Sequence, residues 1–218
     1  TIKVLSAVTP QGASAVAEAE RFSVCANSGE QNGWSVENRP ATIRKLHGPL
    51  RTVFAIKSVL TPWKRAEKNV EFLYERRLWM SAEGVIGNWV RLTNTGQKSA
   101  SLSGWKQSSG IRAIFSYPSA QKKELALLAW NPKGQLDEFH LPHWYQLGMG
   151  IVGGVAQPTG SGLLAALDNH DQFLYLKDNS LKSLSANECP MSAAALVMGL
   201  GGWSCEFTPG NTYESTWR

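Results

Sequence analysis

The densest group of residues that could do acid–base or metal chemistry is His140-Leu-Pro-His143, which follows Asp137 and Glu138. Imidazole and carboxylate groups bind zinc or act as general acids and bases when a further ligand comes close. The spacing supplies no further ligand, and Pro142 prevents the helical face on which the metalloprotease pattern depends. We therefore expect no metal site, and the sequence leaves open whether the two histidines have a chemical role.

A second chemical pattern is Gly148-x-Gly150-x-x-Gly153, which matches the dinucleotide-binding fingerprint by its letters. That fingerprint requires a helix that begins at the glycines, and Pro158 interrupts any such helix. We therefore expect no cofactor. Over about eight residues the segment resembles the glycine-rich loop of the RNA-binding subunits of CRISPR complexes, which implies close backbone approach to a nucleic-acid strand. We favour an ordinary loop that connects two strands.

The remaining patterns do not support catalysis. The sequence contains no Gly-x-Ser-x-Gly elbow, Walker loop or His-Glu-x-x-His motif. The carboxylate pairs Asp137/Glu138 and Asp168/Asp171 could serve glycoside chemistry, but their positions are more typical of solvated turns. An N-terminal Thr1 is a nucleophile in some enzymes, although removal of an initiator methionine leaves the same residue.

Charge is distributed unevenly along the chain, whose formal net charge is +5 at pH 7. Residues 1–38 have a net charge of −2, residues 39–123 one of +12, and residues 124–218 one of −5. Cations that share one face would attract polyanions and steer association. The alternative is that the acidic C-terminal part packs against the basic middle part and neutralises it.

Tryptophans are interleaved with these cations. Four of the nine, Trp63, Trp79, Trp89 and Trp105, lie in the basic segment and have a cation within two residues. Aromatic rings stack on unpaired bases at about 1–3 kcal/mol per base while cations contact phosphates, so the pattern favours single-stranded nucleic acid. The same residues suit sugar stacking or an anionic membrane surface, and a single indole is more typical of a core position.

The candidate nucleic-acid-binding residues are the cations and tryptophans of this basic segment. They are Lys64, Arg65, Arg76, Arg77, Trp79, Trp89, Arg91, Lys98, Trp105, Lys106, Arg112, Lys122 and Lys123.

The elements that must position these residues are predicted to be helical first and extended later. Ala- and Glu-rich composition predicts a short helix over residues 13–21. Apolar spacing predicts helices over 41–60, divided at Gly48-Pro49, and over 61–80, and a short one over 192–200. Strands are expected over the ranges 1–8, 22–25, 85–95, 99–106, 111–117, 173–177, 203–207 and 212–217. Residues 125–130 and 135–141 form a predicted hairpin around a type I turn at 131–134. The expected fold is α+β, with helices mainly in residues 13–80 and mostly antiparallel short strands after residue 84.

Length and composition suggest a globular chain of 218 residues that forms a single domain, 1–218. Three widely spaced cysteines, Cys25, Cys189 and Cys205, do not suggest a disulfide framework, so we expect a reducing, cytoplasmic location. No apolar run reaches the length of a membrane-spanning helix without Pro and Gly, so we expect a soluble protein without a membrane span.

These observations together predict a non-catalytic protein that binds RNA or single-stranded DNA through its basic central segment, as a subunit of a larger assembly with other proteins. One alternative is a self-assembling structural protein such as a virion or filament subunit. A second alternative is a carbohydrate-binding module or a glycoside-active enzyme that uses exposed tryptophans and carboxylate pairs.

Overall fold

The structure is a computed structural model that describes much of the chain, and the regular secondary structure in what it describes is almost entirely β-strand. The described residues are 19–26, 32–36, 40–82, 85–102, 110–117, 124–130, 133–139, 146–147, 152–156, 162–166, 173–177, 194–201 and 206–218. No α-helix occurs within these ranges. They accordingly include no helix with the length and hydropathy needed to cross a bilayer.

The chain divides into two compact units, each built from two stretches of sequence. Unit 1 comprises residues 1–22 and 112–199, and unit 2 comprises residues 23–111 and 200–218. The C-terminal strand therefore returns to the unit that the middle of the chain has built.

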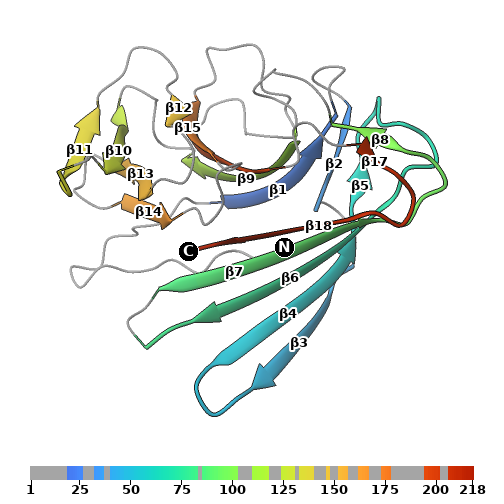
Figure 1. Ribbon diagram of the computed structural model, residues 1–218, viewed down its shortest axis with the longest axis horizontal. Coiled ribbons are helices and arrows are strands. Elements are labelled where there is room, and N and C mark those ends of the chain that lie inside the picture. Colours follow the sequence, from blue (N-terminus) through green and yellow to red (C-terminus); the bar gives the residue numbers. More distant parts are fainter. Residues whose placement is uncertain are drawn as a thin grey trace. The chain divides into compact units, whose positions relative to one another are not determined.

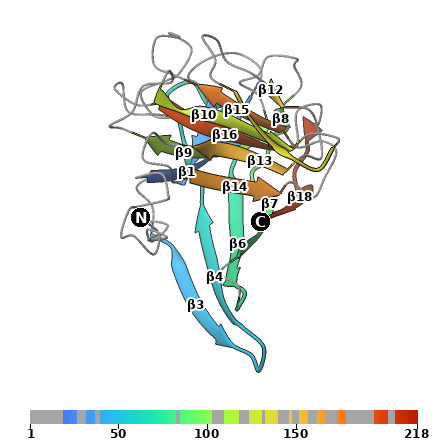
Figure 2. The same cartoon turned by 90° about the vertical axis from the view of Figure 1, so that its left-hand side faces the viewer.

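Unit 2 contains a five-stranded sheet in which all neighbours run antiparallel. In spatial order its strands are β18 (Thr212–Trp217), β7 (Ile86–Asn94), β6 (Phe72–Met80), β4 (Thr52–Val59) and β3 (Thr42–His47). Figures 1 and 2 both show the β3–β4 hairpin reaching farther along the sheet than β6 and β7. The strand β3 thus forms one edge of the sheet.

Alternation along these strands divides their side chains between two faces. One is a core face, whose buried residues include Ile56, Phe72, Tyr74, Val90, Leu92 and Trp217. The opposite face carries exposed and half-buried residues, such as Lys57, Arg77, Trp89 and Glu214. We call this second surface the open face.

Short strands complete unit 2. They are β2 (Gly33–Ser35), β5 (Thr61–Pro62), β8 (Ala100–Ser101) and β17 (Glu206–Phe207). The ring of Phe72 meets Trp34 and Phe207 edge to face, with centroids 5.0 and 5.5 Å apart, which is a favourable aromatic geometry. The buried Asn94 side chain donates to the backbone carbonyls of Lys98 and Phe207, both at 2.8 Å. This amide ties the loop after β7 to the C-terminal stretch.

Unit 1 is also antiparallel. One sheet has the order β11 (Leu136–Phe139), β10 (Ala126–Trp130), β13 (Val152–Ala156) and β14 (Gly162–Ala166). The other strands with residues in unit 1 follow the order β12 (Gln146–Leu147), β15 (Phe173–Lys177), β16 (Ala194–Gly201), β9 (Gly110–Tyr117) and β1 (Ala19–Cys25). Residues 23–25 of β1, 110–111 of β9 and 200–201 of β16 belong to unit 2, where β1 pairs with β2. The described residues of unit 1 therefore contain no α-helix.

The predicted α+β fold is wrong, because the expected helices that the structure describes are strands. Residues 41–60 form β3 and β4, the region 61–80 contains β5, two turns and β6, and residues 192–200 contain most of β16. Of the expected helix 13–21, residues 13–18 lie outside the described residues, and residues 19–21 belong to the strand β1. Aromatic and β-branched residues dominate β4, and β6 contains the aromatic residues Phe72, Tyr74 and Trp79; such residues fit a pleated surface better than a helix.

Several predicted strands are confirmed. The range 85–95 contains β7, 111–117 lies within β9, and 173–177 and 212–217 are β15 and β18. The predicted hairpin is confirmed by the antiparallel pairing of β10 with β11. Residues 131 and 132 of its turn, and the expected first strand 1–8, lie outside the described residues.

Candidate nucleic-acid interface

Three rows of cross-strand neighbours lie on the open face. Counted from the β3–β4 turn, the rows are Val53–Trp79–Gly87, Ala55–Arg77–Trp89–Thr216 and Lys57–Glu75–Arg91–Glu214. Successive rows are two residues apart, which is about 7 Å along an antiparallel strand. The strand register therefore gathers cations and tryptophans from distant parts of the sequence.

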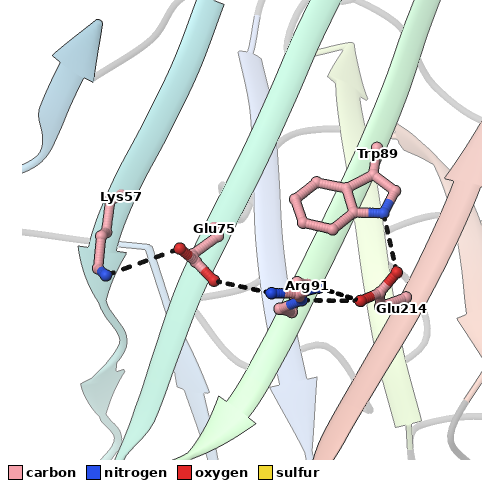
Figure 3. A network of polar contacts seen from close by, with 5 residues as sticks. All are labelled: Lys57, Glu75, Trp89, Arg91 and Glu214. Atoms are coloured by element: carbon pink, nitrogen blue, oxygen red, sulfur yellow. Dashed lines mark hydrogen bonds and ion pairs between the residues drawn. The ribbon is translucent and has the colours of Figure 1, made fainter.

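The third row is a network of charged side chains that crosses four strands (Figure 3). Lys57 Nζ lies 3.6 Å from Glu75, and Arg91 lies 4.0 Å from the second oxygen of the same carboxylate. Arg91 also donates through Nε and Nη2 to Glu214 Oε1, at 2.7 and 2.6 Å. Trp89 Nε1 donates to the other oxygen of Glu214 at 3.1 Å. Each carboxylate therefore holds two neighbours.

The donors around Glu214 shift its titration. The hydrogen bonds from Arg91 and then from Trp89 lower the pKa of Glu214 because they stabilise its ionised form. The positive charges of Arg91 and Arg77 lower it further. Glu214 therefore keeps its ionised form to a lower pH than an isolated glutamate does, and in that form it accepts the hydrogen bonds of Arg91 and Trp89.

The two tryptophans of the open face each lie beneath a guanidinium group. Arg51 Cζ lies 4.9 Å from the ring centroid of Trp79. Arg77 and Arg91 lie 4.6 and 5.2 Å from that of Trp89. Cation–π attraction holds such groups over the ring and limits the number of conformations that they sample.

Arg51 and Arg77 are the cations that this face leaves available. Within the described residues, the structure pairs neither of them with a carboxylate within 4.0 Å, whereas Arg91 is paired twice. Both side chains are exposed. A planar, exposed guanidinium without a carboxylate partner is suited to phosphate contacts and to stacking on a base.

The structure brings four of the predicted binding residues together on the open face: Arg77, Trp79, Trp89 and Arg91. The other described candidates lie elsewhere. Lys64 and Arg65 are exposed in a turn between β5 and β6, and Lys98 forms an ion pair with Glu67 at 3.0 Å. Four candidates lie outside the described residues: Trp105, Lys106, Lys122 and Lys123.

Two predicted phosphate contacts are buried arginines. Arg76 lies on the core face, where Nε donates to Asn88 Oδ1 at 3.2 Å and the guanidinium lies 5.6 Å from the ring centroid of Trp217. Arg112 in β9 is fully buried. Neither side chain is placed to meet a ligand at the surface, so we leave both out of the interface.

Sequence reasoning missed Arg51 and Lys57. Both fall in the range 41–60, which was expected to be helical, and a helix would have separated them from the tryptophans of residues 79 and 89. The available signal was the alternation of Val53, Ala55 and Lys57 with residues of the core face along β4. Read with a period of two, it places Lys57 beside Glu75.

The other chemical candidates contribute nothing to this interface. His140, His143, Thr1 and the Asp168/Asp171 pair lie outside the described residues, and Gly153 of the glycine pattern lies within β13 rather than in a loop. In the part of the chain that the structure describes, no three His, Cys, Asp or Glu side chains are grouped as metal ligands.

One acidic residue of the C-terminal part does pair with the basic segment. Glu214 neutralises Arg91, but Arg51 and Arg77 keep their charge. The open face is thus a cationic and aromatic surface with two fixed carboxylates. Comparison of the chain with protein-family models, with curated proteins and with solved structures gives no match to any of them.

Proposed function

We propose that this protein binds single-stranded nucleic acid, either RNA or single-stranded DNA, on the open face of the five-stranded sheet. The observation that carries the proposal is the pair of exposed guanidinium groups, Arg51 and Arg77, held over Trp79 and Trp89 without a carboxylate partner in the described residues. The protein acts in this proposal as a non-catalytic subunit of a larger assembly.

The two kinds of residue have separate tasks. Arg51, Arg77 and the exposed Lys57 supply the positive charge that phosphates require, and release of counterions from the nucleic acid favours binding. Trp79 and Trp89 hold the guanidinium planes, on which unpaired bases can stack. The carboxylates of Glu75 and Glu214 fix Arg91 and keep the two neighbouring rows ordered.

Single strands fit this surface better than duplexes. Stacking on guanidinium and aromatic planes requires bases whose faces are accessible, which a duplex conceals within its own stack. Such stacking is tolerant of sequence because every base has a π-face. The expected interaction is therefore strongly dependent on salt and weakly dependent on sequence.

The chemistry of the cysteines supports a reducing compartment for this activity. The sequence has three widely spaced cysteines and no Cys-x-x-Cys pair, a usage that is more typical of the cytoplasm than of secreted proteins. Cellular RNA and other protein subunits are the partners available there.

The test is fluorescence anisotropy with a labelled uridine oligomer of about 20 nucleotides, titrated at several salt concentrations. We expect log affinity to fall linearly with log salt. The variant Arg51→Ala/Arg77→Ala should bind about tenfold more weakly, with a salt slope reduced by about 1.4, because each lost phosphate contact on a single strand removes about 0.7.

The matched control is Lys64→Ala/Arg65→Ala, which removes the same charge from an exposed turn away from the open face. It should retain most of the affinity. Equal losses in the two variants would show non-specific attraction rather than a site on the sheet. Absence of binding to the wild-type protein at 50 mM salt would reject the proposal, and a duplex competitor distinguishes single-strand preference.

A further inference from the structure

The turn between β3 and β4 places a leucine at the end of the hairpin. Gly48 N donates to Arg51 O at 3.0 Å, so Pro49 and Leu50 alone connect the two hydrogen-bonded positions. The proline ring fixes the backbone of one of these two residues. Leu50, the other, is 95% exposed. The turn therefore presents an apolar side chain to the surroundings from a restricted backbone.

Three further exposed apolar side chains lie near this turn. Leu46 in β3 is 51% exposed, Phe54 in β4 is 43% exposed, and Met80 at the end of β6 is 63% exposed. The strand register joins their positions, because Val53 pairs with both Leu46 and Trp79, the residue before Met80. A group of exposed apolar side chains commonly marks an interaction surface. We call this group the apolar tip; its members are Leu46, Leu50, Phe54 and Met80.

Cations follow the apolar tip along the hairpin. Residues 42–59, which comprise β3, the turn and β4, contain four lysines or arginines and no acidic residue. Arg44, Lys45 and Arg51 are exposed, and in the described part of the chain none of them has a carboxylate within 4.0 Å. Lys45 and Arg44 precede His47, the last residue of β3, by two and three positions. At about 3.4 Å per residue, they lie about 7–10 Å behind the turn.

This order of apolar and cationic groups matches the surface of an anionic bilayer. In amphipathic segments that lie at such a surface, apolar side chains enter about 5–10 Å, to the boundary between headgroups and acyl chains. Lysine and arginine keep their charged ends among the headgroups. Each such cation strengthens binding to anionic lipid about fivefold. The half-buried Trp79 beside Met80 adds an indole, a group that is enriched at this depth.

Other occupants fit the apolar tip less well. Nucleic acid would engage Arg44 and Lys45, but Leu50 and Met80 offer no planar ring on which a base can stack. A second copy of the chain would bring its own cations against these cations, and like charges repel. An anionic lipid surface satisfies both the apolar and the cationic part of the hairpin.

We propose that the end of the β3–β4 hairpin inserts into the headgroup region of an anionic phospholipid bilayer. The apolar tip reaches the acyl-chain boundary, and Arg44 and Lys45 contact the lipid headgroups. The contact is peripheral and goes beyond the proposed binding of nucleic acid. The two surfaces share Arg51, which follows Leu50, so the variants that test the lipid contact leave Arg51 unchanged.

The test is flotation of the nuclease-treated full chain with phospholipid vesicles. The wild-type protein should float with phosphatidylcholine vesicles that contain about 30% phosphatidylserine, and bind pure phosphatidylcholine vesicles at least tenfold more weakly. Leu50→Ser should weaken binding to the anionic vesicles about tenfold, because it removes the most exposed apolar side chain of the tip. Arg44→Ala/Lys45→Ala should weaken it at least tenfold and reduce its dependence on salt.

Two matched controls should bind the anionic vesicles as the wild-type protein does. Leu164→Ser removes a leucine that is 51% exposed in β14 of unit 1. Lys64→Ala/Arg65→Ala removes the same charge as the paired cation variant from the turn between β5 and β6, beyond the opposite end of β4. Equal losses in Leu50→Ser and Leu164→Ser would overturn the proposal, as would a wild-type protein that does not float with the anionic vesicles at low salt.

Oligonucleotide anisotropy and sedimentation velocity on the same variants test the other occupants. Leu50→Ser should bind the labelled uridine oligomer as tightly as the wild-type protein does. A loss of oligomer affinity in Leu50→Ser with unchanged vesicle binding would place the tip in the nucleic-acid surface and contradict the lipid contact. Self-association that Leu50→Ser abolishes, in a protein that does not bind vesicles, would assign the tip to a second copy instead.

Discussion

The indole of Trp79 occupies the space that a Cβ atom on Gly87 would fill. The two residues are direct cross-strand neighbours on β6 and β7, and a Cβ built on Gly87 collides with the Cε2, Cζ2 and Nε1 atoms of the ring. Glycine is thus required by close approach rather than by backbone conformation. The position of the Trp79 ring in turn determines where the Arg51 guanidinium group lies.

Gly87→Ala is therefore expected to displace Trp79. Because the colliding atoms belong to a rigid ring, we expect a loss of about 1–3 kcal/mol in the free energy of unfolding, measured by urea denaturation. Gly48→Ala is the control, since its Cβ would meet only a backbone oxygen at 3.4 Å, and it should change stability by less than about 0.5 kcal/mol. Equal effects of the two substitutions would contradict this account.

The adjacent arginines of β6 should separate stability from binding. Arg76→Ala leaves the buried Asn88 carbonyl without its guanidinium donor and removes the contact with Trp217, so it should cost about 2–4 kcal/mol in unfolding. Arg77→Ala removes an exposed side chain and should cost less than about 1 kcal/mol. Anisotropy should show the reverse order, with weaker binding only for Arg77→Ala. If Arg76→Ala remained folded and were the only one of the two variants to lose affinity, the open face would not be the binding surface.

The pKa of Glu214 should depend on the hydrogen bonds that its carboxylate accepts. Its pKa is lowered in the folded state, so its contribution to stability is complete above the ordinary glutamate pKa of about 4.3 and is lost as pH falls through the lowered value. Arg91→Ala should raise the pKa of Glu214 more than Arg77→Ala does, because Arg91 donates hydrogen bonds whereas Arg77 acts only through its charge. Carboxyl NMR shifts measure both pKa values, and equal upward shifts in the two variants would contradict the assignment.

The variant Tyr117→Phe should be more stable to unfolding than the wild-type protein. It is buried in β9, its hydroxyl has no hydrogen-bond partner in the described part of the chain, and burial raises its pKa. Tyr117→Phe removes a buried polar group and should raise the free energy of unfolding by up to about 1 kcal/mol. Tyr213→Phe is the matched comparison: its hydroxyl donates to Leu200 O at 3.0 Å, so the same change should lower stability by about 0.5–1.5 kcal/mol. A destabilised Tyr117→Phe would reveal an acceptor for this hydroxyl.

The sequence predicts strands well where one face alternates clearly, as in β7 and in the β10–β11 hairpin. It fails at β6 because apolar residues occur on both faces of that strand. In a helix, Leu73 and Tyr74 would lie on the same side, whereas in β6 they point to opposite faces of the sheet. Helical spacing therefore arose by coincidence from a strand that buries one face and half-buries the other.

For a similar reason, only part of the candidate interface could be predicted from the sequence. The spacings of Arg77 from Trp79 and of Trp89 from Arg91 are those of neighbours on one side of a strand. Sequence patterns do not reveal the strand register, which sets Arg77 opposite Trp89 and Glu214 opposite Arg91. The burial of Arg76 and Arg112 was equally hidden, because it depends on which face of each strand the fold covers.

The C-terminal position of β18 also constrains how the chain acquires its structure. Arg91 on β7 meets Glu214 on β18 across a separation of 123 positions, and every residue of unit 1 between 112 and 199 is made in the interval. During synthesis on the ribosome, β7 therefore cannot pair with β18 until the residues of unit 1 between 112 and 199 have been made. Such distant pairing slows folding, so a nascent chain of this protein would benefit from a chaperone that shields this edge of β7 until β18 emerges.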